Sequence, residues 1–230
     1  MKPILFNTEM VKAILDGRKT VTRRVAFKAD ELREFPCASY PDGWWFRGRV
    51  YANREKAMNA AEGIMRLCKY RPGDILWVRE TFRIDYLSNI PGTGRVQYKD
   101  ETYMDIRFHP DRYEMMRRAQ RKPGWRPNEN MPREAARIFL RVSDVRVERL
   151  QDITLFDMDA EGRPICDGGI MMACSPGECI RCDKSLENSI PWFQRTWDST
   201  IKPADLPTYG WEANPWVWVI EFEVCEKTEA

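Results

Sequence analysis

The sequence predicts an α+β fold built around a small, curved or closed β-sheet, with short flanking helices and long insertions. Strand-like segments are spread along the whole chain and alternate with short helical ones, which is typical of a mixed fold. In the segment 138–147, apolar side chains alternate up to Val142 and resume at Val145 in the opposite phase. Such a phase change indicates a bulge or bend, as a curled sheet requires.

The first 25 residues predict a helix followed by a strand. Apolar residues at positions 10, 11, 14 and 15 fall on one face of a helix that Thr8 can cap and Gly17 ends. The segment 18–25 is basic and rich in β-branched residues, which favours a strand. We therefore expect a cluster of cations at the point where the helix passes into the strand.

Later elements follow from turn signals and periodicity. A turn at Pro72-Gly73 precedes a strand over 75–81, and an Asp42-Gly43 turn before Trp44 favours a hairpin. One helix is expected from Thr154 to Gly162. Residues at helical spacing indicate a second helix that contains Trp192, Phe193, Thr196 and Trp197. Alternating apolar residues indicate a final strand, whose core face is formed by Trp216, Trp218, Ile220, Phe222 and Val224.

A chain of 230 residues suits one elaborated domain or two small ones, and we interpret it as one domain. We assign its core to residues 1–25, 71–83, 136–162 and 191–225. The stretches 26–70, 84–135 and 163–190 are interpreted as insertions into that core.

The net charge of +2 hides an asymmetry between the two parts of the chain. Residues 1–150 hold 31 Lys and Arg against 20 Asp and Glu, whereas residues 151–230 hold 6 against 15. A basic N-terminal part suggests an anionic partner.

The histidine and cysteine content excludes some kinds of site. His109 is the only histidine, so sites with two His ligands are excluded, and a His-based triad would have to use a residue in a loop-like stretch. No apolar run is long enough to cross a bilayer, and the first residues run directly into a polar segment. With seven cysteines and no export signal, we expect a cytoplasmic protein without membrane partners; the oligomeric state stays open.

Two motifs resemble the ASCH domain, a PUA-like β-barrel family. The first is a helix followed by Gly17-Arg18-Lys19-Thr20-Val21-Thr22-Arg23-Arg24, and the second is the Pro72-Gly73-Asp74 strand start. The segments Met131–Arg137 and Trp197–Ser199 look like the larger ASCH-like proteins of tailed phages and prophages. The match covers about half of the chain, the part assigned to the core.

The resemblance implies a protein that binds a nucleoside, a nucleotide or RNA. Small bacterial members of the family include an amidohydrolase that removes the acetyl group from N4-acetylcytidine. By motif position, its catalytic Lys, Thr and Glu match Lys19, Thr22 and Glu161. Other members are thought to bind RNA or to cut it, so a non-catalytic RNA-binding module and an ASCH-type ribonuclease stay open as alternatives.

The residue chemistry is consistent with an amidohydrolase. A threonine hydroxyl needs a base to become a nucleophile, and the like charges around Lys19 disfavour its ammonium form. Lys19 and Thr22 can face each other only if the turn after Gly17 extends past Lys19. Glu161 is expected at the C-terminal end of a helix, where the helix dipole disfavours a carboxylate. The sequence equally allows Lys19 and Glu161 to be solvated surface residues.

Several basic side chains are candidates for contacts with a nucleotide or nucleic acid. The resemblance and the charge of the motif suggest substrate or nucleic-acid binding by Arg18, Thr20, Arg23, Arg24 and Arg79. A second candidate is the aromatic and basic run from Trp44 to Arg49, which would otherwise be the core of its insertion. A third is the run Arg112, Arg117, Arg118, Arg121, Lys122 and Arg126, which would otherwise be an exposed helix face.

Four cysteines are clustered within the 163–190 insertion. Their C-x7-C-x4-C-x2-C spacing is compatible with a tetrahedral zinc site made by Cys166, Cys174, Cys179 and Cys182. The alternative is four free thiols in a loop. We expect structural zinc at most and no organic cofactor.

Overall fold

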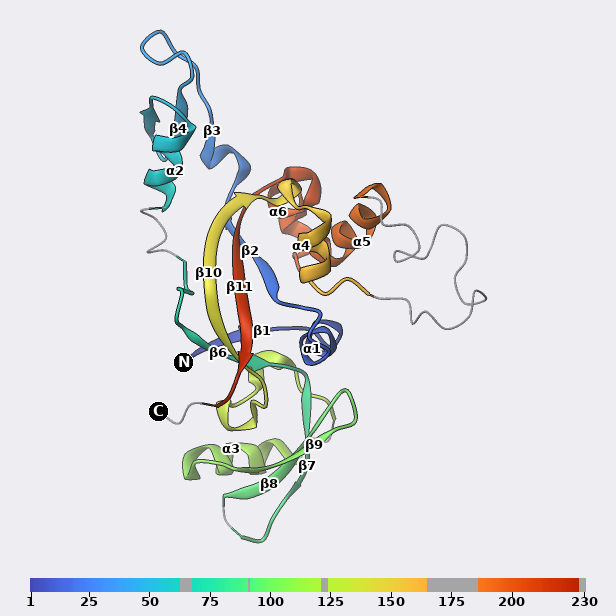
Figure 1. The fold of residues 1–230 in the computed structure, drawn as a ribbon. Helices are drawn as coiled ribbons and strands as arrows, with labels where there is room; N and C mark the ends of the chain where they lie inside the picture. The colour runs from blue at the N-terminus through green and yellow to red at the C-terminus, as the bar shows by residue number, and fades with distance from the viewer. Residues whose placement is uncertain (63–67, 91, 121–123, 165–185, 228–230) are drawn as a thin grey trace, which may run out of the picture. The chain divides into compact units, whose positions relative to one another are not determined.

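The fold is described from a computed structural model for residues 1–62, 68–90, 92–120, 124–164 and 186–227 (Figure 1). The chain divides into two compact units. The first unit comprises Met1–Gly17, Pro72–Ser143 and Phe222–Ala230, and the second comprises Arg18–Arg71 and Asp144–Glu221. The strands β10 (Phe139–Arg149) and β11 (Trp216–Cys225) run from one unit into the other.

The first unit begins with a strand and a short helix. Strand β1 (Lys2–Leu5) pairs in parallel with β6 (Ile75–Arg79), and β6 pairs antiparallel with the start of β10. Helix α1 (Thr8–Leu15) is capped by Asn7, whose side chain accepts a 2.9 Å hydrogen bond from the amide of Met10. The expected cap at Thr8 is therefore wrong by one residue, because Thr8 is already the first helical residue. Gly17, at φ +72°, ends the helix as predicted.

A second sheet in the first unit has a core of its own. Strands β7 (Phe82–Leu87), β8 (Thr93–Tyr98) and β9 (Tyr103–Arg107) are antiparallel neighbours, and helix α3 (Pro110–Gln120) packs against β7 (Figure 1). The side chains buried between them are Phe82, Val96, Tyr98, Ile106, Phe108, Met116, Met131 and Ala135. Most of the segment 84–135 is thus a packed sheet-and-helix layer.

A buried ion-pair cluster lies beside this core. The guanidinium of Arg137 donates two 2.8 Å hydrogen bonds to the carboxylate of Glu80, approaches Asp100 at 2.8 Å, and stacks 4.0 Å from the ring centre of Tyr98. Burial raises the pKa of Glu80, although the hydrogen bonds and charge of Arg137 act in the opposite direction. Arg137 therefore favours the ionised form of Glu80 in this buried position.

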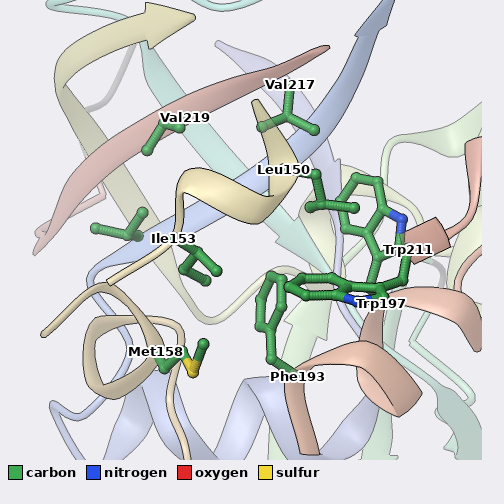
Figure 2. Close-up of a cluster of buried hydrophobic side chains, with 9 residues drawn as sticks. Leu150, Ile153, Met158, Phe193, Trp197, Trp211, Val217 and Val219 are labelled. Carbon is green, nitrogen blue, oxygen red and sulfur yellow. The ribbon is translucent and has the colours of Figure 1, made fainter. Parts of the chain in front are cut away.

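The second unit contains a larger hydrophobic core. Strand β2 (Val21–Phe27) pairs antiparallel with β11, and the helices of this unit include α4 (Leu155–Ala160), α5 (Leu186–Asp198) and α6 (Leu206–Tyr209). Figure 2 shows Phe193 and Trp197 of α5 packed with Trp211. The full cluster of buried residues is Val21, Leu150, Ile153, Met158, Phe193, Trp197, Trp211, Val217 and Val219.

Both faces of β11 are buried over residues 216–220. Val217 and Val219 belong to the cluster of Figure 2, while Trp216 lies on the other face, packs against Phe27 and donates a 2.9 Å hydrogen bond to the carbonyl of Leu32. The expectation of a single core face was therefore too narrow. It was wrong for Val224, which lies next to the last residue of β11 and is 60% exposed.

A small antiparallel sheet in the second unit is formed by β3 (Leu32–Glu34), β4 (Trp44–Phe46) and β5 (Arg49–Tyr51), followed by helix α2 (Arg54–Glu62). Its tight turn is Arg47-Gly48, with φ +44° and +82°, as a two-residue hairpin turn of this kind requires. The hairpin predicted before Trp44 is confirmed, since β3 and β4 pair antiparallel, and a turn precedes β4, where the amide of Gly43 donates a 3.0 Å hydrogen bond to the carbonyl of Tyr40. Asp42-Gly43 is not itself a two-residue turn with positive φ. Gly43 is needed for a different reason, since a Cβ there would lie 2.5 Å from the carbonyl oxygen of Phe35.

The α+β prediction is confirmed, and so is the phase change in β10, where Ser143 and Asp144 are both exposed between Val142 and Val145. Within the described residues, however, no sheet closes into a barrel: β1 and β2 each have one neighbouring strand in the sheet order. None of the described helices combines the length and apolar character that crossing a membrane requires. The four clustered cysteines, Arg121 and Lys122 lie outside the described residues.

Candidate functional site around Lys19 and Glu161

Lys19 and Glu161 are brought together by the main chain. The two residues form an isolated antiparallel bridge, and the amide of Thr20 donates a 2.8 Å hydrogen bond to the carbonyl of Ala160, the last residue of α4. Gly162 follows with φ +89°, a conformation that favours glycine and turns the chain directly after Glu161. The helix predicted from Thr154 to Gly162 is confirmed as α4, and the structure shows that Thr154 caps it.

The side chain of Lys19 is buried, with 2% of the residue exposed. Its Nζ donates to Oε2 of Glu161 at 2.5 Å, to the carbonyl of Glu161 at 3.0 Å and to the carbonyl of Val21 at 2.8 Å. Burial lowers the pKa of Lys19, and this effect outweighs the opposing charge of Glu161. The prediction that neighbouring cations also lower this pKa is confirmed, since Arg24 and Arg23 act in that direction.

Arg23 holds the other oxygen of Glu161. Its Nη1 donates to Oε1 at 3.2 Å, while Nη2 and Nε approach one oxygen of Glu148 at 2.5 and 3.1 Å, and Nη2 lies 3.4 Å from Asp157. Burial alone would lower the pKa of Arg23, but the charges of the three carboxylates raise it. The guanidinium of Arg23 therefore forms ion pairs with three carboxylates of the protein.

Thr22 is also buried, at 2% exposure, and pairs with Ile220 of β11. Its hydroxyl accepts a 2.6 Å hydrogen bond from Nη1 of Arg24, which also donates to the carbonyl of Arg23 at 2.8 Å. Burial lowers the pKa of Arg24 despite the nearby Glu161 and Tyr70. The hydroxyl of Thr22 thus lies in the field of a desolvated cation.

The relation between Lys19 and Thr22 depends on where the strand begins. Strand β2 starts at Val21, so Lys19 and Thr20 precede it and the regular alternation of a strand does not apply between Lys19 and Thr22. The amine of Lys19 lies at the carbonyl of Val21, the residue directly before Thr22. The turn after Gly17 ends before Lys19, which already forms a β-bridge with Glu161, so the turn does not extend past Lys19 as the sequence-based prediction required.

The remaining motif residues have different surroundings. Arg18 donates to the carbonyls of Gly162 and Arg163 at 3.1 and 3.3 Å, and Thr20 is exposed. Arg79 belongs to the first unit, where it donates to the carbonyl of Met131 at 3.3 Å through both Nε and Nη2.

Glu148 was not predicted as a site residue. Val145 and Val147 face the core after the phase change in β10, which leaves Arg146 and Glu148 on the opposite face. The sequence does show that Glu148 alternates with the core residues of this strand, but it does not show that the side chain faces Arg23. Asp157 of α4 is a further acidic residue that contacts Arg23.

The described arginines of α3 each lie near a carboxylate. Arg112 is 3.5 Å from Glu134, while Arg117 and Arg118 are 3.6 and 3.9 Å from Glu114. These side chains are exposed, so their role in nucleic-acid binding stays a prediction.

Among the described residues, no group of three or more His, Cys, Asp and Glu is arranged to hold a metal ion. His109 lies in an exposed loop before α3, with Nδ1 3.4 Å from Asp111. Comparison of the chain with protein-family models, with curated proteins and with solved structures found no match to any of them.

Proposed function

We propose that this protein is an ASCH-type, PUA-like amidohydrolase that removes an acyl group from a modified cytidine such as N4-acetylcytidine. The observation that carries the proposal is the buried Lys19, whose pKa is lowered and whose amine lies between Glu161 and the carbonyl preceding Thr22. A lysine in such surroundings is suited to act as a base, and the adjacent threonine supplies a nucleophile.

In the proposed reaction, Lys19 first releases one proton to solvent, and the Oγ1 of Thr22 then attacks the carbonyl carbon of the amide while its proton passes to the uncharged amine of Lys19. The C–N bond then breaks, and the leaving N4 nitrogen takes that proton back from Lys19. Water hydrolyses the resulting acyl-threonine ester and releases the carboxylic acid. The sum is one amide and one water converted to one amine and one acid.

Arg24 and Glu161 support these steps. Arg24 already donates to the oxygen of Thr22, so it stabilises negative charge that develops there during attack. Glu161 contacts the amine of Lys19 and stabilises its charged form after it has accepted the proton. Arg23 holds Glu161 from the other side and acts as a positioning residue.

The test is the absorbance change on deacylation of N4-acetylcytidine and related N4-acylcytidines by the purified protein. We expect turnover that falls by at least about a hundredfold in Lys19→Ala and in Thr22→Ala, the usual range for loss of a general base or a nucleophile. Lys12→Ala, an exposed lysine on α1, is the matched control and keeps the parent activity. Absence of turnover with every N4-acylcytidine, or turnover that survives both Lys19→Ala and Thr22→Ala, would overturn the proposal.

A further inference from the structure

The small sheet of the second unit, β3–β4–β5, has one face that α2 does not cover. Along β3 and β4, Leu32 and Phe46 are buried opposite each other, while the next pair, Arg33 and Trp45, points to the other face. Helix α2 contacts β4 and β5, and Arg54 stacks 5.7 Å from the ring of Trp44, which shares the face of Phe46. Trp45 is therefore not part of the packing beneath the sheet.

Arg33 and Trp45 form a surface that is both aromatic and charged. The guanidinium of Arg33 lies 5.5 Å from the ring of Trp45 and 5.5 Å from the ring of Phe35. Phe35 is 38% exposed, and Val50, the cross-strand neighbour of Trp45 on β5, is 36% exposed. Indole rings and guanidinium planes are the two protein groups on which unpaired nucleobases most often stack.

A pocket of about 370 Å³ opens at this surface, lined by Asp30, Glu31, Arg33 and Trp45. Its volume is within the range of small-molecule binding sites. Two carboxylates border it, and Glu31 already accepts a 3.1 Å hydrogen bond from the amide of Lys28 through Oε1 while its Oε2 lies 3.9 Å from Arg47. The carboxylates repel a phosphate group, but they accept hydrogen bonds from the amino groups of a base.

We infer that this pocket binds an unpaired nucleobase that carries an exocyclic amino group, stacked on Trp45 and Arg33 and hydrogen-bonded to the carboxylates of Asp30 and Glu31. Acidic side chains accept hydrogen bonds from the N4 amino group of cytosine, and the amino groups of adenine and guanine are equivalent donors. Uracil has no amino group and is disfavoured. The inference goes beyond the proposed reaction, because the residues of this pocket are distinct from Lys19, Thr22 and Glu161.

The experiment is isothermal titration calorimetry of the full-length protein with CMP, AMP, GMP and UMP, and with single-stranded hexamers of ribocytidine, deoxyribocytidine and ribouridine. We expect the amino-bearing nucleotides to bind at least tenfold more tightly than UMP. Binding that is equal for CMP and both cytidine hexamers identifies a mononucleotide site. Tighter binding of the ribocytidine hexamer identifies a strand of RNA, and equal tightening for both cytidine hexamers identifies a single strand of either kind.

Four variants test whether the nucleotide binds in this pocket. Trp45→Ala is expected to weaken CMP binding tenfold or more, Trp45→Phe to retain most of it, and Asp30→Asn to narrow the preference for CMP over UMP. Trp44→Phe, on the opposite face of the same strand, is the matched control and binds as the parent does. The inference is overturned if no nucleotide binds, if UMP binds as tightly as CMP, or if Trp45→Ala leaves binding unchanged. Since calorimetry needs no turnover, the outcome is separate from that of the deacylation test.

Discussion

Lys19 and Glu161 hold each other through both backbone and side chain: they oppose each other in an antiparallel bridge, and Nζ of Lys19 contacts both the carboxylate and the carbonyl of Glu161. The pair joins the segment before β2 to the end of α4, two parts of the chain separated by about 140 residues in sequence. A bridge of this kind fixes the position of both charged groups before any ligand binds.

Removing both partners of this buried pair should cost less unfolding free energy than the sum of the costs of removing each one alone. Lys19→Met leaves Glu161 with Arg23 alone, and Glu161→Gln leaves a buried ammonium without its carboxylate, so each change is expected to cost about 3–5 kcal/mol of unfolding free energy. The double variant should lose less than the sum of the two. Urea unfolding of the four proteins measures this, and strictly additive losses would contradict the coupling.

The lowered pKa of Lys19 predicts a pH dependence of stability at alkaline pH. Between the folded-state pKa and the unfolded value of 10.5, the unfolded chain binds one proton more than the folded protein. The unfolding free energy of the parent should therefore rise with pH relative to Lys19→Met in this window, by up to about 1.4 kcal/mol per pH unit. Urea unfolding at a series of pH values checks this, and a difference between the two proteins that does not change with pH would count against a lowered pKa.

Local signals in the sequence were sufficient for many of the elements. Gly17 ends α1, Thr154 caps α4, and the apolar spacing of Phe193 and Trp197 identifies a buried helix face. One error arose where two adjacent residues can cap the same helix, and another where turn-forming dipeptides lie on both sides of the same strand. Asn7 rather than Thr8 caps α1, and Arg47-Gly48 rather than Asp42-Gly43 forms the tight hairpin turn, because the pairing of strands decides which dipeptide adopts positive φ.

The candidate site shows a different limit of sequence-based prediction. Lys19, Thr22 and Glu161 were suggested by a motif resemblance, and the contact between Lys19 and Glu161 is a tertiary one that no spacing along the chain reveals. Nor does the sequence show that Glu148 faces Arg23, since this requires the pairing of strands that are distant in sequence. Whether a charged side chain is buried depends on how segments distant in sequence pack together in the folded unit.

Arg137 should be essential for stability at neutral pH. Without its hydrogen bonds, the already raised pKa of Glu80 rises further, so Arg137→Met is expected to cost about 3–5 kcal/mol at pH 7. A carboxyl with a raised folded-state pKa contributes stability at low pH that is lost as pH rises through that pKa, so the loss should be smaller near pH 4.5.

Urea unfolding of the parent and of Arg137→Met at the two pH values measures this effect. Arg141→Met serves as the control, since Arg141 is an exposed arginine 3.6 Å from Glu223 and should change stability by less than about 0.5 kcal/mol. An equal loss for Arg137→Met at both pH values would contradict the role assigned to Glu80.

Two glycines of the small sheet should respond differently to alanine. At Gly48 a Cβ meets no atom within 4 Å, so Gly48→Ala is expected to cost only about 1 kcal/mol for the positive φ. At Gly43 the Cβ would lie 2.5 and 2.9 Å from two carbonyl oxygens, so the loss should be larger. Thermal unfolding of both variants tests the order, and a Gly43→Ala protein as stable as the parent would contradict the close approach.

The zinc prediction rests on sequence spacing alone. Elemental analysis of protein purified without added metal should find about one zinc per chain, lost in a variant with Cys179→Ser and Cys182→Ser. Cys37→Ser and Cys225→Ser, outside the cluster, should leave the zinc content unchanged. Absence of zinc in the parent protein would remove the prediction.

The division of the chain has a practical consequence for experiments. The backbone passes between the two units four times, after Gly17, Arg71, Ser143 and Glu221, and two of these crossings lie inside the continuous strands β10 and β11. Neither unit is therefore a single stretch of sequence, and no truncation at one point releases either of them whole. Lys19 and Trp45 both belong to the second unit, so their roles have to be separated by point substitution in the intact chain.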